Sequence, residues 1–187
     1  MNVPSQPDFA EFPKMPRYSR ECLVTEKIDG TNAQVCITED GDIFAGSRSR
    51  WITPAEDNHG FARWVEGNED ELLKLGPGRH FGEWWGQGIQ RNYGLKEKRF
   101  SLFNISRWAD PSVRPACCHV VPALGLGNFD NSRWIHAILD NLKDNGSVAA
   151  PGFMKPEGIV IFHIAGNFGL KKTIEKDEVP KSLANAA

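Results

Sequence analysis

Long apolar runs are missing from this 187-residue sequence. Its longest apolar stretches cover a few residues, whereas a transmembrane helix needs about 20. The segment Met1–Pro7 has neither the basic start nor the apolar core of a secretory signal peptide. With 40% hydrophobic and 25% charged residues, the composition is that of a soluble globular protein. These features argue against a membrane protein and lead us to expect a cytoplasmic one.

Cysteine is scarce, and its spacing indicates neither a disulfide framework nor a metal site. The four cysteines are Cys22, Cys36, Cys117 and Cys118. Adjacent residues of a strand point to opposite faces, so Cys117 and Cys118 cannot readily bind one zinc ion together. We therefore expect no structural zinc.

Internal repeats and low-complexity linkers are also missing, and 187 residues are too few for two typical domains. We expect one domain over residues 1–187. The last stretch, Val179–Ala187, is too short for a second core, so we expect no C-terminal accessory domain.

An excess of either charge is missing as well, since the formal net charge is −2. A nucleic-acid-binding protein needs clustered lysine and arginine, so any basic surface here must be local. The candidate basic segments are Arg48 and Arg50, Arg91–Arg99, and Lys171, Lys172 and Lys176.

Short runs of apolar and β-branched residues between turn residues are present throughout, which is the pattern of strands. We expect the first two strands to form a hairpin around Asp29 and Gly30, and the last two to form one around Ala165–Asn167. Because hairpins join antiparallel strands, the sheets should be antiparallel. The expected strands cover about residues 21–27, 33–38, 43–47, 80–85, 100–105, 117–122, 157–164 and 168–174.

Three helices are expected between these strands. Thr53–Glu56 reads as a capping box that opens a helix ending near Gly67. A second helix covers Asn68–Leu75 and stops at the following glycines. The third has apolar side chains at helical spacing from Trp134 to Leu142. The order of strands and helices predicts an α+β fold.

The segment Lys27–Asn32 places a lysine, a carboxylate and a glycine in a turn after the first expected strand. Such a turn can hold a lysine nucleophile. The segment resembles the nucleotidyl-transfer motif of the covalent nucleotidyltransferases, which are the DNA ligases, RNA ligases and mRNA capping enzymes. Because Asn32 stands where DNA ligases and capping enzymes more often carry arginine, the segment is most similar to that of the ATP-dependent RNA ligases.

Later segments resemble further motifs of the same family in the same order, so that the resemblance spans about residues 21–175. Glu83 occupies the position of the family's ribose-binding glutamate, and Phe103 that of the aromatic residue that stacks on the base. The loop Gly88–Gly94 is typical of RNA ligases in particular. The other matching segments are Ala45–Arg50, His80–Gly86, Phe100–Ile105, Pro156–Ile161 and Phe168–Lys172.

The resemblance implies a fold of two antiparallel sheets with flanking helices, the nucleotidyltransferase fold, with ATP held between the sheets. It implies that Lys27 attacks the α-phosphate and that Glu157 helps hold Mg²⁺ near the phosphates. A free lysine has a pKa of about 10.4 and is mostly ammonium at neutral pH, so the site must favour the neutral amine. The implied nucleotide-binding residues are Glu26, Ile28, Asn32, Arg48, Glu83, Phe103 and Glu157.

The last motif departs from the family pattern, which usually has two lysines separated by one residue. Such lysines face the nucleotide together because strand side chains alternate. Here Lys171 and Lys172 are adjacent, and Gly169 stands where the first lysine is usual. We count both lysines as catalytic candidates and expect Lys171 to be the leading phosphate contact. Lys172 should point to the opposite face unless a bulge re-aims it.

The resulting hypothesis is an ATP-dependent RNA ligase that joins RNA ends in three steps. Lys27 takes AMP from ATP, AMP passes to a 5′-phosphate, and a 3′-hydroxyl then displaces AMP. Asn32 is linked to the later steps. The alternatives are a DNA ligase core acting on DNA ends, and a nucleotide- or RNA-end-binding module that has lost catalysis. With no accessory domain expected, strand joining would be slow, salt-sensitive or dependent on an accessory protein.

Overall fold

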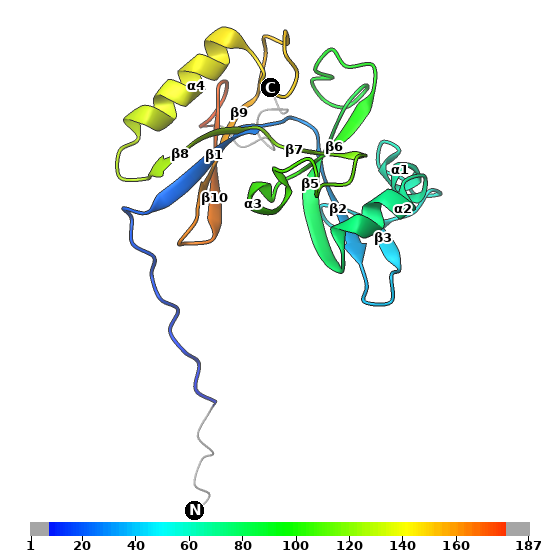
Figure 1. Ribbon diagram of the computed structural model, residues 1–187. Coiled ribbons are helices and arrows are strands. Elements are labelled where there is room, and N and C mark those ends of the chain that lie inside the picture. The colour runs from blue at the N-terminus through cyan, green and yellow to red at the C-terminus, as the bar shows by residue number, and fades with distance from the viewer. Residues whose placement is uncertain (1–7, 179–187) are drawn as a thin grey trace, which may run out of the picture.

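The computed structural model describes residues 8–178, which form two β-sheets and several helices (Figure 1). The expectation for Val179–Ala187 lies outside these residues. One sheet has four strands in the order β10-β9-β1-β8. Its strands are β1 (Glu21–Lys27), β8 (Ala123–Asn128), β9 (Gly158–His163) and β10 (Phe168–Thr173).

The second sheet has six strands in the order β4-β3-β2-β5-β6-β7. Its strands are β2 (Thr31–Ile37), β3 (Ile43–Ser47), β4 (Trp51–Ile52), β5 (Gly78–Gly86), β6 (Lys98–Leu102) and β7 (Cys118–Val120). The helices are α1 (Phe61–Glu66), α2 (Glu69–Leu72), the 3₁₀ turn η1 (Leu73–Leu75), α3 (Ile105–Trp108) and α4 (Arg133–Asn145). The α+β prediction with two sheets is confirmed.

Each sheet buries one face beneath its own helices (Figure 1). On the six-stranded sheet, Val35 and Phe100 belong to a core that includes Phe61 of α1 and Leu72 of α2. The four-stranded sheet packs against α4, and their common core is Cys22, Val24, Ile135, Leu139, Leu142, Ile159 and Ile161. A third, smaller cluster is formed by Ile28, Trp85, Tyr93, Val121 and Ala150. It holds the chain where it passes from one sheet to the other.

The predicted hairpin between the first two strands is wrong. Strand β1 pairs with β8 and β9, whereas β2 pairs with β3 and β5, so the chain crosses between sheets at residues 28–30. Gly30 does not have the positive φ of a hairpin turn. A Cβ added there would lie 2.5 Å from the backbone oxygen of Trp84. Gly30 is needed because the crossing chain lies directly on β5.

The first predicted helix begins later than expected. The capping box at Thr53 does form a turn, in which the Glu56 amide donates to the Thr53 hydroxyl at 3.2 Å. The helix nevertheless starts at Phe61, because the Asp57 carboxylate accepts from the amide of Ala62 at 2.8 Å and caps that turn instead. The other two helices lie where predicted, as α2 with η1 and as α4.

The expectation of purely antiparallel sheets is wrong at one edge. Strand β7 runs parallel to β6, with Phe100 opposite Cys118. The intervening residues 103–117 include α3, so this connection is a crossover and not a hairpin. The strand expected at residues 100–105 is β6, which ends at Leu102. Asn104 caps α3 by accepting from the Arg107 amide. Strands β4 and β8 were not predicted.

In residues 8–178, no helix combines the length and apolar character that a bilayer crossing requires.

Candidate active site

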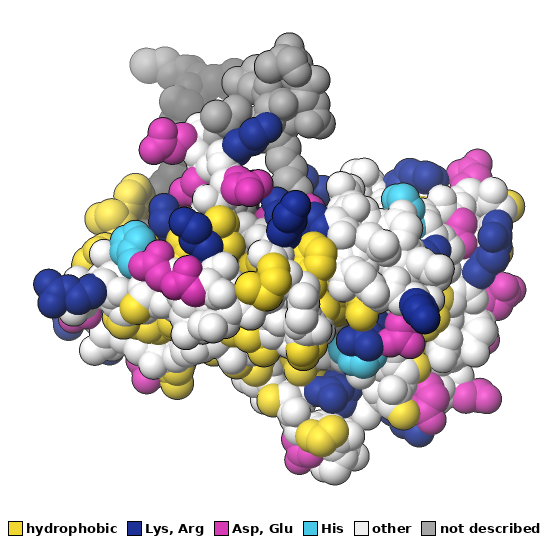
Figure 2. All heavy atoms as spheres, turned by 90° about the horizontal axis from the view of Figure 1, so that it is seen from above, with side chains coloured by type: hydrophobic (Ala, Val, Ile, Leu, Met, Phe, Trp, Pro, Cys, Tyr) yellow, Lys and Arg dark blue, Asp and Glu magenta, His cyan; other side chains and the backbone are white. Residues whose placement is uncertain are grey.

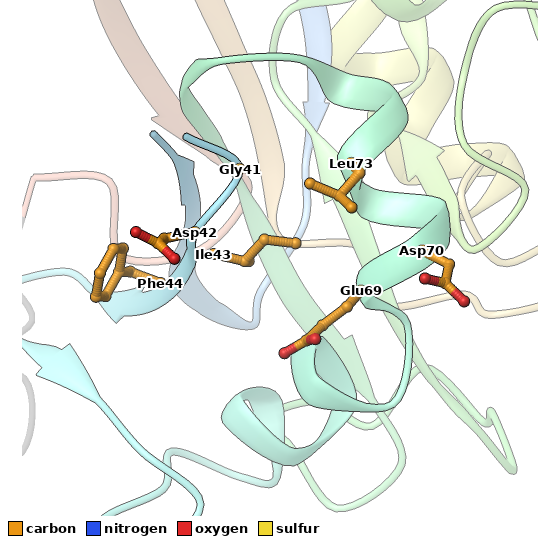
Figure 3. Close-up of a pocket in the computed structure, with 7 residues that line it drawn as sticks. All are labelled: Gly41, Asp42, Ile43, Phe44, Glu69, Asp70 and Leu73. Carbon is orange, nitrogen blue, oxygen red and sulfur yellow. The ribbon is translucent and has the colours of Figure 1, made fainter. Parts of the chain in front are cut away.

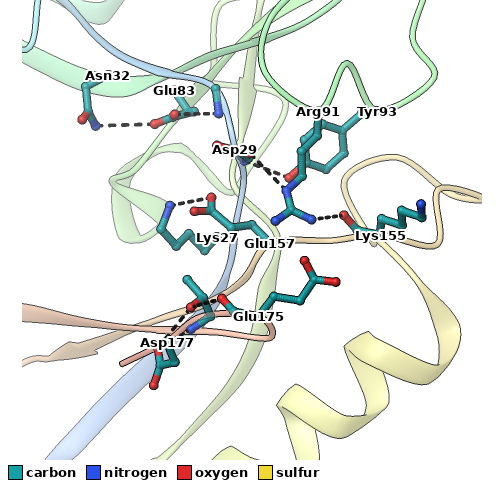
Figure 4. A network of polar contacts seen from close by, with 12 residues as sticks. Lys27, Asp29, Asn32, Glu83, Arg91, Tyr93, Lys155, Glu157, Glu175 and Asp177 are labelled. Atoms are coloured by element: carbon teal, nitrogen blue, oxygen red, sulfur yellow. Dashed lines mark hydrogen bonds and ion pairs between the residues drawn. The ribbon is translucent and has the colours of Figure 1, made fainter. Parts of the chain in front are cut away.

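Lys27 is the last residue of β1 and lies where the chain leaves the four-stranded sheet. It pairs with Gly158, the first residue of β9, which places Glu157 beside it. The Lys27 ammonium Nζ lies 2.6 Å from Oε2 of Glu157 (Figure 4). The lysine side chain is 19% exposed and the glutamate side chain 3%. An almost buried carboxylate therefore holds an amine that solvent and ligands can still reach.

Glu83 of β5 binds the chain just after the crossing. Its Oε1 accepts from the Gly30 amide at 3.0 Å, and its Oε2 accepts from Nδ2 of Asn32 at 3.4 Å (Figure 4). Asn32 and Glu83 are also directly opposed in the β2–β5 ladder. Two residues that the motifs predicted, 51 positions apart in the chain, are thus in contact.

Burial raises the pKa of Glu83 to about 7, although the positive charge of Lys27 and the Gly30 hydrogen bond oppose the shift. The nearby Glu157 and Asp29 carboxylates add to the increase in pKa. Glu83 therefore interacts electrostatically with Lys27, Glu157 and Asp29. Nearby cations would favour the charged form of these carboxylates.

The loop Gly88–Gly94 contacts the crossing between the sheets at Asp29, which the sequence did not predict. Tyr93 accepts from the Asp29 amide at 2.8 Å, and Nε of Arg91 lies 3.0 Å from Oδ2 of Asp29. Arg91 also donates to the Lys155 carbonyl at 3.0 Å, next to the segment that carries Glu157 (Figure 4). Arg91 therefore links both sides of the Lys27–Glu157 pair.

These contacts had a partial signal in the sequence, because Gly88–Gly94 matches a motif and Arg91 belongs to a candidate basic segment, although neither feature predicts a contact with Asp29. Gln90, Asn92 and Tyr93 all have positive φ, a conformation that glycine usually takes. Burial raises the pKa of Tyr93, so its hydroxyl stays protonated. The hydroxyl oxygen accepts the hydrogen bond from the Asp29 amide.

Lys171 shares the sheet face of Lys27. It lies opposite Val160 in β9, which in turn lies opposite Thr25 in β1, two residues before Lys27. Directly opposed residues point to the same face, and so do residues two apart in one strand. The β9–β10 pairing runs without a register shift from Phe168 to Thr173, so no bulge alters this alternation.

Lys172 lies on the other face of the sheet. It is opposite Ile159, which belongs to the core beneath α4. Its Nζ lies 3.2 Å from Oδ2 of Asp177. The register therefore brings Lys171 toward the side of Lys27 and leaves Lys172 in a separate ion pair.

The side chain of Glu26 points away from Lys27. Its carboxylate accepts from the Ser147 hydroxyl at 2.6 Å and from the amides of Val148 and Ala149 at 2.8 Å each. Burial raises the pKa of Glu26, and these hydrogen bonds lower it in opposition. The structure thus gives this carboxylate a structural role, and a nucleotide contact from Glu26 would come from its backbone.

Three other predicted residues differ in their burial. Ile28 is 4% exposed and packs in the cluster with Trp85, so its side chain is part of the core. Phe103 follows β6 directly and is 41% exposed, and its amide continues the ladder by donating to the Phe81 carbonyl at 3.0 Å. Arg48 is exposed directly after β3.

Glu157 is a suitable oxygen ligand for a divalent cation. Within residues 8–178, no three His, Cys, Asp or Glu side chains converge to form a metal cage. Mg²⁺ does not need one, because one or two carboxylates with phosphate oxygens and waters satisfy its coordination. The residues present therefore fit a cation held jointly by Glu157 and a bound triphosphate.

A separate cavity of about 370 Å³ lies at the β2–β3 turn beside α2 (Figure 3). None of its lining residues belongs to the segments around Lys27. They are Gly41, Asp42, Ile43, Phe44, Glu69, Asp70 and Leu73.

Two sheets that meet at a lysine, with a glutamate from β5 and another preceding β9, define a nucleotidyltransferase fold. Solved structures of an RNA ligase from Naegleria gruberi share this fold. Its structure with PPi is 22% identical with a TM-score of 0.61, covering 83% of this chain and 50% of that chain. A variant with ATP and Mn is 23% identical with a TM-score of 0.59, covering 84% and 51%. The chain spans about half the length of these relatives.

A family model of RNA ligases matches residues 20–174. The chain therefore belongs to the RNA ligase family. A comparison with curated proteins found no match.

Proposed function

We propose that this chain is an ATP-dependent RNA ligase that works through a covalent lysyl-AMP intermediate. The observation that carries the proposal is the partly exposed Lys27 amine, 2.6 Å from the buried Glu157 carboxylate, in a chain of the RNA ligase family. In the first step, the neutral Nζ of Lys27 forms a bond to the α-phosphorus, the bond from that phosphorus to the pyrophosphate oxygen breaks, and the nitrogen passes one proton to water.

The other residues bind and orient in this proposal. Lys171, on the sheet face of Lys27, contacts the phosphates, and Arg48 adds a second cation. Glu83 accepts from the ribose hydroxyls, and Phe103 offers an exposed ring for the base. Backbone groups at Glu26 and Ile28 contact the base.

Mg²⁺ is the proposed metal, and Glu157 with the triphosphate would hold it. When bound, a divalent cation offsets the negative charge of the triphosphate and of the departing pyrophosphate. The Lys27 amine is held by Glu157 in the ion pair, so the pair must open before attack. The relatives solved with ATP and Mn support a divalent requirement.

The two later steps act on RNA ends. A 5′-phosphate oxygen attacks the phosphorus of lysyl-AMP and releases Lys27. A 3′-hydroxyl then attacks the activated 5′-phosphorus and releases AMP. Asn32, which donates to Glu83, contacts the nucleic acid in these steps of the proposal. We propose that residues 1–187 act as one adenylyltransferase domain, with an accessory protein assisting strand joining.

Four free cysteines support a cytoplasmic location, where thiols stay reduced.

The test is incubation with magnesium and ATP labelled at the α-phosphate, followed by denaturing electrophoresis. The proposal expects label on the protein, and none when the label is on the γ-phosphate, since that phosphate leaves with pyrophosphate. Absence of α-label at any divalent metal concentration contradicts the proposal and favours a module that binds RNA ends without catalysis.

A further inference from the structure

The six-stranded sheet has an unusual solvent face beside the candidate active site. The solvent face of an antiparallel sheet normally alternates polar side chains with the core residues behind it. Here the outward positions include four large aromatic side chains that are 41–52% exposed, namely Phe44, Trp51, Phe81 and Phe103. Scattered exposed rings need no explanation, whereas a group on neighbouring strands of one face indicates a binding surface.

Three of these rings lie in a single row across the strands. Trp51 is opposite Gly46, Gly46 is opposite Gln34, and Gln34 is opposite Phe81. Phe103 extends the row, because its amide donates to the Phe81 carbonyl. With strands about 4.8 Å apart, the row from Trp51 to Phe81 covers about 14 Å.

The face between Trp51 and Phe81 carries the Gln34 side chain and the cation of Arg79. Gln34 lies over Gly46, where an added Cβ would be 2.7 Å from Cγ of the glutamine. Nη1 of Arg79 donates to Oε1 of Gln34 at 3.2 Å, and the guanidinium carbon lies 5.3 Å from the centre of the Trp51 ring. A planar guanidinium beside an exposed indole offers both a stacking surface and a positive charge.

This row is continuous with the candidate active site. Phe81 is two residues from Glu83 in β5, so both point to the same face, and Glu83 contacts the chain three residues after Lys27. At the opposite end of the row the surface becomes acidic. Phe44, whose ring centre is 5.9 Å from that of Trp51, borders the cavity lined by Asp42, Glu69 and Asp70 (Figure 3).

We propose that the face carrying Trp51, Phe81 and Arg79 is a stacking platform for unpaired bases of an RNA strand whose end lies at Lys27. The proposal rests on the RNA ligase function proposed above. Aromatic faces bind any base, and Arg79 with Arg48 attracts the backbone, so the platform accepts single strands without strict sequence preference. The acidic cavity beside Phe44 repels phosphates and ends the platform there.

The test measures binding of a short, 5′-phosphorylated, single-stranded oligoribonucleotide by fluorescence anisotropy at fixed salt. Trp51→Ala should weaken its affinity roughly 5- to 150-fold, the loss expected for one stacked base. Trp51→Phe keeps a ring and should recover most of the affinity. Phe168→Ala is the control, because Phe168 is also an exposed aromatic residue, at 41% against 48% for Trp51, but lies on the other sheet. It should bind RNA as the unmodified chain does.

Self-adenylylation with ATP is measured on the same samples and separates the two proposals. The platform proposal predicts unchanged adenylylation in Trp51→Ala, since the ring does not touch the lysine. Normal adenylylation with undiminished RNA affinity overturns the platform and leaves the ligase proposal intact. The platform is also overturned if Trp51→Ala keeps its RNA affinity but dissociates a dimer, or if a blunt duplex binds as tightly as the single strand.

Discussion

At the scale of residues, three carboxylates around one lysine dominate the chemistry of the site. Glu157 is paired with Lys27 and Asp29 with Arg91, whereas Glu83 is in no ion pair among the residues that the structure describes and is affected by the charge of Lys27. Glu83 is accordingly the carboxyl whose pKa is most clearly raised, to about 7. Its titration provides a property of the site that can be measured without any substrate.

We predict that the unmodified chain loses stability as the pH rises from about 4.5 to 7, and that Glu83→Gln does not. The pKa of Glu83 is raised from 4.5 to about 7 on folding, so the folded chain binds more protons in this window. The contribution of the protonated carboxyl is complete below about pH 4.5 and is lost as the pH rises through 7. It amounts to on the order of 3 kcal/mol.

Urea unfolding of both proteins across this pH range checks the prediction. The unmodified chain should lose stability relative to Glu83→Gln as the pH rises, while glutamine keeps an oxygen for the Gly30 amide. Parallel stability curves for the two proteins would show that Glu83 titrates normally.

We predict that Glu157→Gln lowers the rate of adenylylation about 100-fold or more, because it removes the proposed metal ligand and the ion-pair partner of Lys27. The rate should also require more magnesium to reach half its maximum. Glu175→Gln is the matched control, since Glu175 is exposed nearby (Figure 4). A magnesium dependence identical to that of the unmodified chain would exclude Glu157 as a ligand.

At the scale of elements, strand register decides which of two adjacent lysines can serve the site. Lys171 lies on the face of Lys27, and Lys172 lies opposite Ile159 on the face of α4. We predict that Lys171→Ala slows adenylylation at least 10-fold more than Lys172→Ala does, as single-turnover rates at saturating ATP would show. Equal losses would mean that the strand shifts register when ATP binds.

The crossing between the sheets depends on Gly30. We predict that Gly30→Ala destabilises the fold by about 1–3 kcal/mol, because its Cβ would overlap the Trp84 backbone and the Trp85 side chain. Gly41→Ala is the control, since Gly41 lies in the β2–β3 turn and has nothing within 4 Å of the added Cβ. Its cost would be limited to backbone strain at positive φ. A Gly30→Ala chain as stable as the unmodified one would mean that the crossing is loose.

Much of the element pattern was predictable from sequence, and the failures have local physical causes. Strand alternation correctly placed Lys171 and Lys172 on opposite faces. The apparent hairpin at residues 27–33 failed because Asp-Gly also serves a close crossing of two sheets, which is a tertiary requirement. The helix at Thr53 failed because a capping box specifies one turn and Asp57 caps the next.

The candidate site was predictable where motifs covered it and was missed where contacts are long-range. Lys27, Glu83 and Glu157 come together as the motifs implied. The bonds of Arg91 and Tyr93 to Asp29 join positions 62 and 64 residues apart, and no local pattern predicts such pairs. The carboxylate of Glu26 proved to be a buried acceptor for residues 147–149, which its place beside the lysine did not indicate.

At the scale of the whole molecule, charge limits how tightly nucleic acid can bind. The net charge is −2, and Figure 2 shows basic and acidic side chains interspersed on the face seen from above. With about three phosphate contacts, a fourfold rise in salt should weaken the binding of single-stranded RNA roughly 20-fold. We predict that strand joining by the isolated chain is slow and falls steeply with salt, whereas self-adenylylation does not.

A salt series that follows both steps on one nicked or single-stranded substrate checks this prediction. Addition of a candidate accessory protein should restore joining without accelerating adenylylation. Fast joining by the chain alone, insensitive to moderate salt, would contradict it.

The most direct test of the account is to locate AMP on the protein. After incubation with ATP and magnesium, the chain is digested and the modified peptide is identified by mass spectrometry, with Lys27→Ala analysed in parallel. We predict that AMP is attached to Lys27, and that Lys27→Ala folds normally but carries none. AMP on another lysine, or undiminished AMP on Lys27→Ala, would contradict the assignment of Lys27 as the nucleophile.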